Sequence, residues 1–263
     1  MSERIPPFKA DQIGVQSVRF HSGVPIPSVT DASVDPYIKT RTSKAPLVEA
    51  LVFNPQTTER YPGIIVLHEW WGLTSQIKDT AGRLAREGYV VLLPNLYARH
   101  GGMVTANAEV ASALSEQIKD ADVLQDLMSC CEFLNTQDRV QRAVHGVVGF
   151  GMGGTLAIRF ACHRRRLRTA VSFYGNMVTP PELLKDLGCP LLYHQPGRDD
   201  RVSPQEVEQL RQLGKEFGKQ VEILGYPDAP HAFMNETRKE NYRPDAAASA
   251  WSATADFLKK HLT

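Results

Sequence analysis

The stretch that most constrains the fold of this chain is a glycine-dense turn at residues 149–154, Gly-Phe-Gly-Met-Gly-Gly. Two apolar valines precede the turn, and residues 155–161 that follow it have the composition of a helix. A strand, a sharp turn and a helix in this order are typical of a parallel sheet with the turn at its carboxyl edge. Gly149 and Gly153 are the small residues that let strand and helix pack closely.

The middle residue of this turn is Gly151. In a nucleophile elbow, with the pattern G-x-nucleophile-x-G, that position carries the Ser or Cys that attacks an acyl group. The elbow backbone costs a residue with a side chain about 1–3 kcal/mol, whereas glycine adopts it freely. The sequence therefore predicts a hydrolase-type turn without its attacking atom.

Charge and composition exclude several classes of partner. Lys+Arg 30 against Asp+Glu 29 gives a net charge of +1, so we expect no nucleic acid and no anionic membrane surface as partner. No apolar run approaches the ~18 residues that a membrane span needs, and residues 1–7 lack the pattern of a secretory signal. The four cysteines have no metal-ligand spacing and are interpreted as free core thiols. We therefore expect a cytoplasmic protein.

The remaining pattern alternates buried strands with helices, which predicts one α/β domain at 46–263, with a mostly parallel sheet covered by helices on both faces. Apolar runs at 47–53, 63–68, 89–94, 169–175, 190–195 and 221–226 are the expected strands besides the one before the turn. The expected helices are 75–87, 106–136 with a break near 116–120, 155–161, 204–217 and about 245–262. Residues 1–45 are interpreted as a loop-rich extension packed on the domain, with β-like pieces at 15–20 and 37–40; a flexible tail is the alternative.

Two polar residues follow predicted strands in the chain order of a nucleophile, acid and histidine triad. Asp199 follows the strand at 190–195, with Asp200 as its neighbouring rival, and His231 follows the strand at 221–226. An acid that orients a histidine makes the histidine an effective general base. Glu69 directly follows the buried run at 63–68, where a carboxylate needs a partner.

Five stretches in order resemble the dienelactone hydrolase family, over roughly residues 47 to 262. They are His-Glu-Trp-Trp-Gly at 68–72, Pro-Asn-Leu-Tyr-Ala-Arg at 94–99, the turn at 149–154, Gly-Arg-Asp-Asp-Arg-Val at 197–202 and His-Ala-Phe at 231–233. The resemblance implies an α/β-hydrolase fold that acts on carboxylic esters or lactones. It implies no cofactor and no metal.

The same resemblance implies a role for each matched residue. Asp199 would orient His231, the general base and later the acid, and Glu69 matches a glutamate that interacts with the nucleophilic thiol. The backbone N–H groups of Trp70 and Met152 would form the oxyanion hole. The arginine that holds a substrate carboxylate is matched by Arg99, and the substrate-binding residues predicted with it are Tyr97, Trp71 and Phe233.

Two positions depart from the family pattern. Gly151 replaces the cysteine, and Asn235 stands where a second carboxylate-binding arginine is expected. Three hypotheses follow: a hydrolase disabled at the covalent step, a binding protein for a small carboxylate or carbonyl compound, or slow hydrolysis by a water that His231 activates. The expected partner is a small ester, lactone or carboxylate, and the expected state is a monomer or small homo-oligomer.

No other residue is a good substitute nucleophile. Cys162 is expected to lie down the helix in the core, Thr155 to face the helix, and Ser172 to belong to the neighbouring strand.

Overall fold

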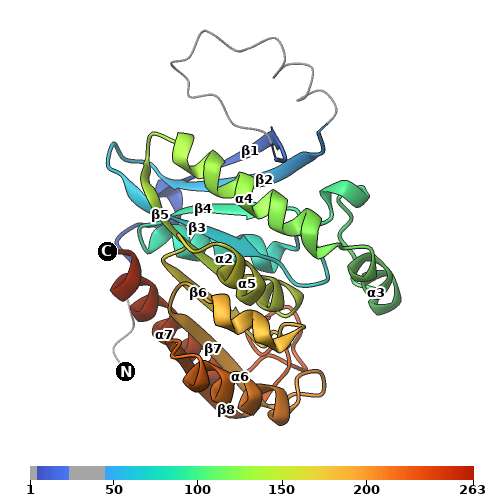
Figure 1. Ribbon diagram of the computed structural model, residues 1–263. Helices are drawn as coiled ribbons and strands as arrows, with labels where there is room; N and C mark the ends of the chain where they lie inside the picture. The colour runs from blue at the N-terminus through green and yellow to red at the C-terminus, as the bar shows by residue number, and fades with distance from the viewer. Residues whose placement is uncertain (1–4, 24–44) are drawn as a thin grey trace.

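The computed structural model describes residues 5–23 and 45–263 and folds them around one eight-stranded sheet (Figure 1). Its strands are β1 Ile13–His21, β2 Leu47–Pro55, β3 Tyr61–Leu67, β4 Val90–Pro94, β5 Val140–Phe150, β6 Thr169–Phe173, β7 Leu191–Arg198 and β8 Val221–Pro230. They lie in the order β1-β2-β4-β3-β5-β6-β7-β8. Strands β3 to β8 pair parallel, while β2 pairs antiparallel with β1 and β4. The predicted mostly parallel sheet is confirmed.

Helices cover both faces of the sheet (Figure 1). They are α2 Ser75–Arg86, α3 Ala108–Glu116, α4 Asp120–Thr136, α5 Met152–His163, α6 Pro204–Glu216 and α7 Pro244–Leu262. Ile65 and Leu67 of β3 belong to one buried cluster with residues of α4, α5 and α6. Ile64 and Val66, which point to the opposite face, belong to a second cluster with residues of α2 and α7. A continuous apolar run is therefore buried on both sides, as its pattern predicts.

The N-terminal part of the chain contributes the edge of this sheet. The predicted piece at 15–20 lies within β1, which pairs with β2 from Ile13 opposite Pro55 to His21 opposite Leu47. The piece predicted at 37–40 lies outside the described residues. Between α3 and α4, residues 117–119 are non-helical, so the break expected near 116–120 is confirmed.

Close contact between backbones explains the glycines around the turn at 149–154. A Cβ on Gly153 would lie 2.4 Å from the carbonyl oxygen of Leu67, and one on Gly149 would lie 1.9 Å from the carbonyl oxygen of Gly153. Helix α5 therefore packs directly against the ends of β3 and β5, which only residues without a side chain permit. This packing fixes the position of Gly151.

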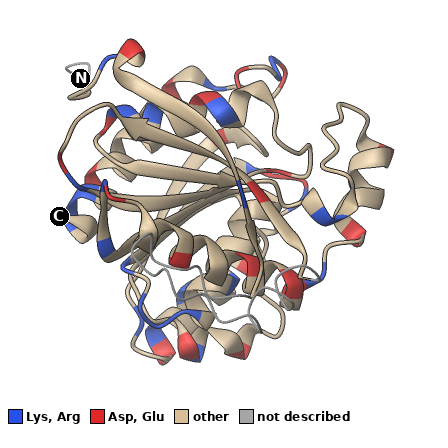
Figure 2. Cartoon of the chain, turned by 90° about the horizontal axis from the view of Figure 1, so that it is seen from above, with Lys and Arg blue, Asp and Glu red and all other residues tan. Residues whose placement is uncertain are grey.

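Lys and Arg are interspersed with Asp and Glu around the outside of the molecule, in keeping with the net charge of +1 (Figure 2). Within the described ranges, no helix is both long and apolar enough to cross a lipid bilayer. The four cysteines are buried and free, as the sequence predicts.

Candidate active site

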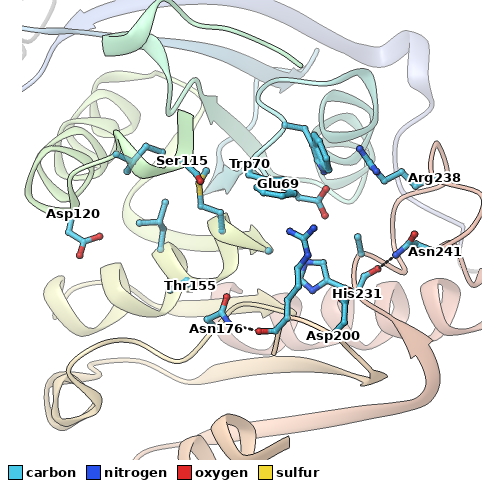
Figure 3. A pocket seen from close by; sticks show the side chains of 17 residues that line it. Glu69, Trp70, Ser115, Asp120, Thr155, Asn176, Asp200, His231, Arg238 and Asn241 are labelled. Carbon is cyan, nitrogen blue, oxygen red and sulfur yellow. Dashed lines mark hydrogen bonds between the residues drawn. The ribbon is translucent and has the colours of Figure 1, made fainter. Parts of the chain in front are cut away.

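The carboxyl ends of four strands bring the central candidates together. Glu69 follows β3, Gly151 follows β5, Asp199 follows β7 and His231 follows β8. All but Asp199 line a cavity of about 580 Å³, which is shown in Figure 3. The other residues that line it are Trp70, Trp71, Ser115, Ile118, Asp120, Met152, Thr155, Leu156, Asn176, Asp200, Arg201, Ala232, Arg238 and Asn241.

Asp199 orients the imidazole of His231. The Nδ1 atom of His231 lies 2.9 Å and 3.1 Å from the two carboxylate oxygens, and Asp200 lines the cavity without entering this pair. The backbone N–H groups of Arg201 and Val202 donate to Asp199 Oδ1 at 2.8 Å and 3.1 Å. Burial works to raise the pKa of Asp199, but the hydrogen bond and charge of His231 and these two amides outweigh it, so the pKa is lowered. The acid is therefore ionised at neutral pH.

The other ring nitrogen of His231 faces the position of the missing side chain. An ideal Cβ on Gly151 would lie 3.6 Å from His231 Nε2 and 3.8 Å from Glu69 Cγ, and apart from its chain neighbours no other described residue comes closer. Gly151 has φ 51° and ψ −117°, a conformation that L side chains rarely adopt. The turn therefore keeps the shape of an elbow, with its attacking position filled only by a hydrogen atom.

Glu69 is a buried carboxyl group with incomplete hydrogen bonding. Asn235 Nδ2 donates to its Oε2 at 3.4 Å, whereas Oε1 has no partner of normal geometry among the described residues. Burial raises the pKa of Glu69, against the charge of His231 and the neighbouring Tyr174, Asn235 and Arg238. Asn235, which replaces the expected arginine, thus contacts the carboxyl group of Glu69.

Two peptide groups border the cavity where an oxyanion hole is predicted. The carbonyl of Glu69 accepts from His68 Nδ1 at 2.6 Å and from the N–H of Gly72 at 3.2 Å. Because a trans peptide directs C=O and N–H oppositely, the N–H of Trp70 points away from these donors. Met152 is the first residue of α5, and the N–H groups of a first helical turn have no intrahelical acceptor.

His68 holds this arrangement as a neutral residue. Burial lowers its pKa to about 4. Its Nε2 accepts from the N–H of Leu96 at 3.0 Å, so the ring proton resides on Nδ1.

Three predicted substrate-binding residues do not line the cavity. Arg99 donates to Asp126 at 2.6 Å and 3.0 Å, so its guanidinium group is already engaged by a carboxylate. The Tyr97 hydroxyl donates to the carbonyl of Trp70 at 2.7 Å, and Phe233 is fully buried between Tyr174 and Tyr226. The structure places these residues outside the cavity lining, where the Tyr97 hydroxyl holds the Trp70 peptide and Phe233 packs in the core, and their predicted contact with substrate stays a prediction.

Trp71 does line the cavity, together with two arginines that the sequence analysis missed. Arg201 lies over the ring of Trp70 at 4.2 Å, and Arg238 lies over the ring of Trp71 at 3.7 Å. In the sequence both arginines belong to charged turns that look solvent-exposed. Only the fold brings the two tryptophans beside them.

The candidate substitute nucleophiles are placed as follows. Cys162 is buried and Ser172 belongs to the neighbouring strand β6, so both predictions are confirmed. Thr155 lines the cavity, so the expectation that it faces the helix was wrong. Thr155 lies in α5, whose first residue, Met152, also lines the cavity.

The strand order, the elbow and the oriented histidine define an α/β-hydrolase. The sequence model of the dienelactone hydrolase family matches residues 48–262, which is most of the chain. The chain therefore belongs to the dienelactone hydrolase family.

Named relatives agree with this assignment. An Escherichia coli K12 protein named "Putative carboxymethylenebutenolidase" is 30% identical over 213 residues, which are 76% of this chain and 77% of that protein. A Klebsiella pneumoniae structure named "Putative Dienelactone Hydrolase" has a TM-score of 0.79 at 24% identity and covers 94% of this chain and 99% of its own. A dienelactone hydrolase-like promiscuous phosphotriesterase from metagenomic libraries has a TM-score of 0.77 at 17% identity, covering 95% and 99%. The two structures support the fold.

Proposed function

We propose that this protein hydrolyses carboxylic esters or lactones without an acyl-enzyme, by means of a water molecule that His231 activates. The observation that carries the proposal is the open position next to Gly151, 3.6 Å from His231 Nε2 when measured at an ideal Cβ. A base that Asp199 orients faces this position from one side. A water molecule in van der Waals contact with the Gly151 Cα, beyond this Cβ position, lies within reach of the base and next to the expected oxyanion groups.

In this mechanism His231 Nε2 takes a proton from the water as its oxygen attacks the carbonyl carbon. The N–H groups of Trp70 and Met152 stabilise the oxyanion, a contribution of about 3–4 kcal/mol per donor in comparable sites. The protonated His231 then gives its proton to the leaving oxygen, as a general acid. Asp199 stabilises the imidazolium while it exists.

The two arginines favour a substrate with a carboxylate. Arg238 stacks on Trp71 and has its nearest carboxylate, Glu240, at 3.9 Å, which leaves its planar donors available. We expect Arg238→Gln to raise KM for 4-nitrophenyl hydrogen succinate about 10-fold, as the loss of about 1.5 kcal/mol from a charged hydrogen bond implies. The neutral 4-nitrophenyl acetate should show little change. The matched control is Arg211→Gln on the exposed surface of α6. Equal effects on both esters would contradict a carboxylate contact.

The experiment that tests the function compares ester hydrolysis by the unaltered protein, His231→Ala and His163→Ala. His163 lies exposed at the end of α5 and is the control for adventitious histidine catalysis. We expect His231→Ala to lower kcat/KM about 10²–10⁴-fold, the usual contribution of general base catalysis, and His163→Ala to have no effect. Intact mass measured during turnover should show no acylated protein.

The other outcomes of this experiment separate the remaining hypotheses. An acylated protein would overturn the water mechanism. Absence of any His231-dependent turnover, together with saturable binding of the succinate ester, would instead support a binding protein on a hydrolase scaffold.

A cytoplasmic location, supported by four free buried cysteines, is part of the proposal. A monomer or small homo-oligomer stays a prediction.

A further inference from the structure

Glu69 has no task in the hydrolysis proposed above, yet its carboxyl group lies at the reacting position. It is 7% exposed, and its Oε1 lacks a partner of normal geometry among the described residues. A buried polar atom without a well-formed hydrogen bond destabilises the folded state. The hydroxyl of Tyr174 is the neighbouring donor, and its contact with Glu69 shifts the pKa of both groups, but the pair does not reach the geometry of a normal hydrogen bond. The placement of the Glu69 carboxyl group at the cavity is explained if a ligand completes its hydrogen bonding.

The imidazole of His231 and the carboxyl group of Glu69, two groups that can transfer protons, both face the part of the cavity next to Gly151. An ideal Cβ on Gly151 is 3.6 Å from His231 Nε2 and 3.8 Å from Glu69 Cγ, so both residues border the space in front of the Gly151 Cα. A substrate atom in that space, in van der Waals contact with the Cα, lies between His231 and Glu69. Figure 3 shows the side chains of Glu69 and His231 near each other in the cavity, whereas Ser115 and Asp120 lie at its far end. In a cysteine hydrolase, the thiol would occupy this space. Here a carbon atom next to a carbonyl group can occupy it.

We propose that this site also catalyses enolisation, the removal and return of a proton on the carbon next to a carbonyl group. His231 Nε2 takes the proton as the C–H bond breaks, and its electron pair forms the carbon–carbon double bond. The carbonyl oxygen gains a proton from the Glu69 carboxyl group and becomes an enol. In the reverse direction Glu69 takes back the proton from oxygen while His231 returns one to carbon, so no oxidant or reductant is needed.

The surroundings suit both roles. Burial raises the pKa of Glu69, so the protonated form that can donate is more populated than for an exposed glutamate. A carboxylic acid kept neutral by burial is an effective donor to an enolate oxygen. The charged and titratable groups that face Glu69 are His231, Tyr174 and Arg238, and Asp199 faces His231 from the other side. The keto-acid class fits this site, because Arg238 is available for a carboxylate.

Levulinate, a small keto acid without an ester bond, is the probe for this activity. Proton NMR in D2O follows loss of the signals next to its ketone, and we expect exchange well above the buffer rate. Glu69→Gln and His231→Ala should each slow exchange by about 10²-fold or more. Glu182→Gln, at an exposed glutamate of the 3-10 turn Pro181–Asp186, is the matched control and should have no effect.

The pH profile distinguishes proton donation from a structural role of Glu69. The exchange rate should fall at high pH as Glu69 ionises, and this fall should persist in Glu69→Asp and vanish in Glu69→Gln. Circular dichroism confirms that each variant is folded. Exchange at the buffer rate, or equal rates in folded Glu69→Gln and the unaltered protein, would overturn the proposal. Levulinate has no ester bond, so proton exchange can be measured whether or not the protein hydrolyses esters. Ester hydrolysis can likewise be measured whether or not exchange occurs.

Discussion

Gly151→Cys is expected to convert this protein into a cysteine hydrolase with a large gain in activity. The new Cβ would lie 3.6 Å from His231 Nε2, so the thiol is within reach of a base that Asp199 already orients. Loss of a nucleophile in an enzyme built around one costs about 10⁶-fold in kcat. We expect a smaller gain of about 10³-fold in kcat/KM, because general base catalysis by His231 on water already contributes about 10²–10⁴-fold in the unaltered protein. The measurement is hydrolysis of 4-nitrophenyl acetate, with intact mass to detect the acylated cysteine.

Gly151→Ala is the matched control for this gain. Both substitutions place a Cβ at φ 51°, so both should lose about 1–3 kcal/mol of stability from backbone strain. Only the cysteine variant has an attacking atom. A Gly151→Cys protein no faster than Gly151→Ala would show that the elbow does not present its side chain to His231. The same conclusion would follow if the gain survived His231→Ala.

The second large effect is expected from Gly153→Ala, in the first turn of α5 between the cavity-lining residues Met152 and Thr155. A Cβ there would lie 2.4 Å from the carbonyl oxygen of Leu67 and 2.6 Å from that of His68, and backbone atoms cannot move aside as a flexible side chain can. We expect a loss of at least ~3 kcal/mol, the upper part of the range for overpacking. This loss occurs although alanine is favoured over glycine in a helix by about 1 kcal/mol. Urea unfolding measures it.

The same substitution in another helix should have the opposite sign. Gly82 lies in α2, and a Cβ on it would meet only Phe53 at 3.9 Å, an ordinary contact. We therefore expect Gly82→Ala to stabilise the protein by up to about 1 kcal/mol through helix propensity alone. If Gly153→Ala were equally harmless, the close approach of α5 to β3 would not be what holds the elbow in place.

Local pattern was sufficient to predict most of the fold. The run at 63–68 is apolar at every position before His68, which predicts burial on both faces, and β3 has that burial because helices cover each side. The glycine spacing predicts the elbow in the same way. Gly149 and Gly153 are needed because α5 starts directly against the strand before it, where a Cβ would meet backbone atoms. The pairing of β1 with β2 does not follow from the sequence, because short β-like pieces do not specify their pairing partners.

The sequence by itself determined the strand ends that carry Glu69, Gly151, Asp199 and His231, because parallel strands bring their carboxyl ends to one edge. Only the tertiary structure decided which charged side chains reach the cavity. Arg99 matches a family motif, yet Asp126 from α4 engages its guanidinium group, whereas Arg201 and Arg238 lie over tryptophans that follow β3. The reason is physical: backbone pattern sets the position of a residue along its element, but a long flexible cation takes its place from partners that are distant in sequence.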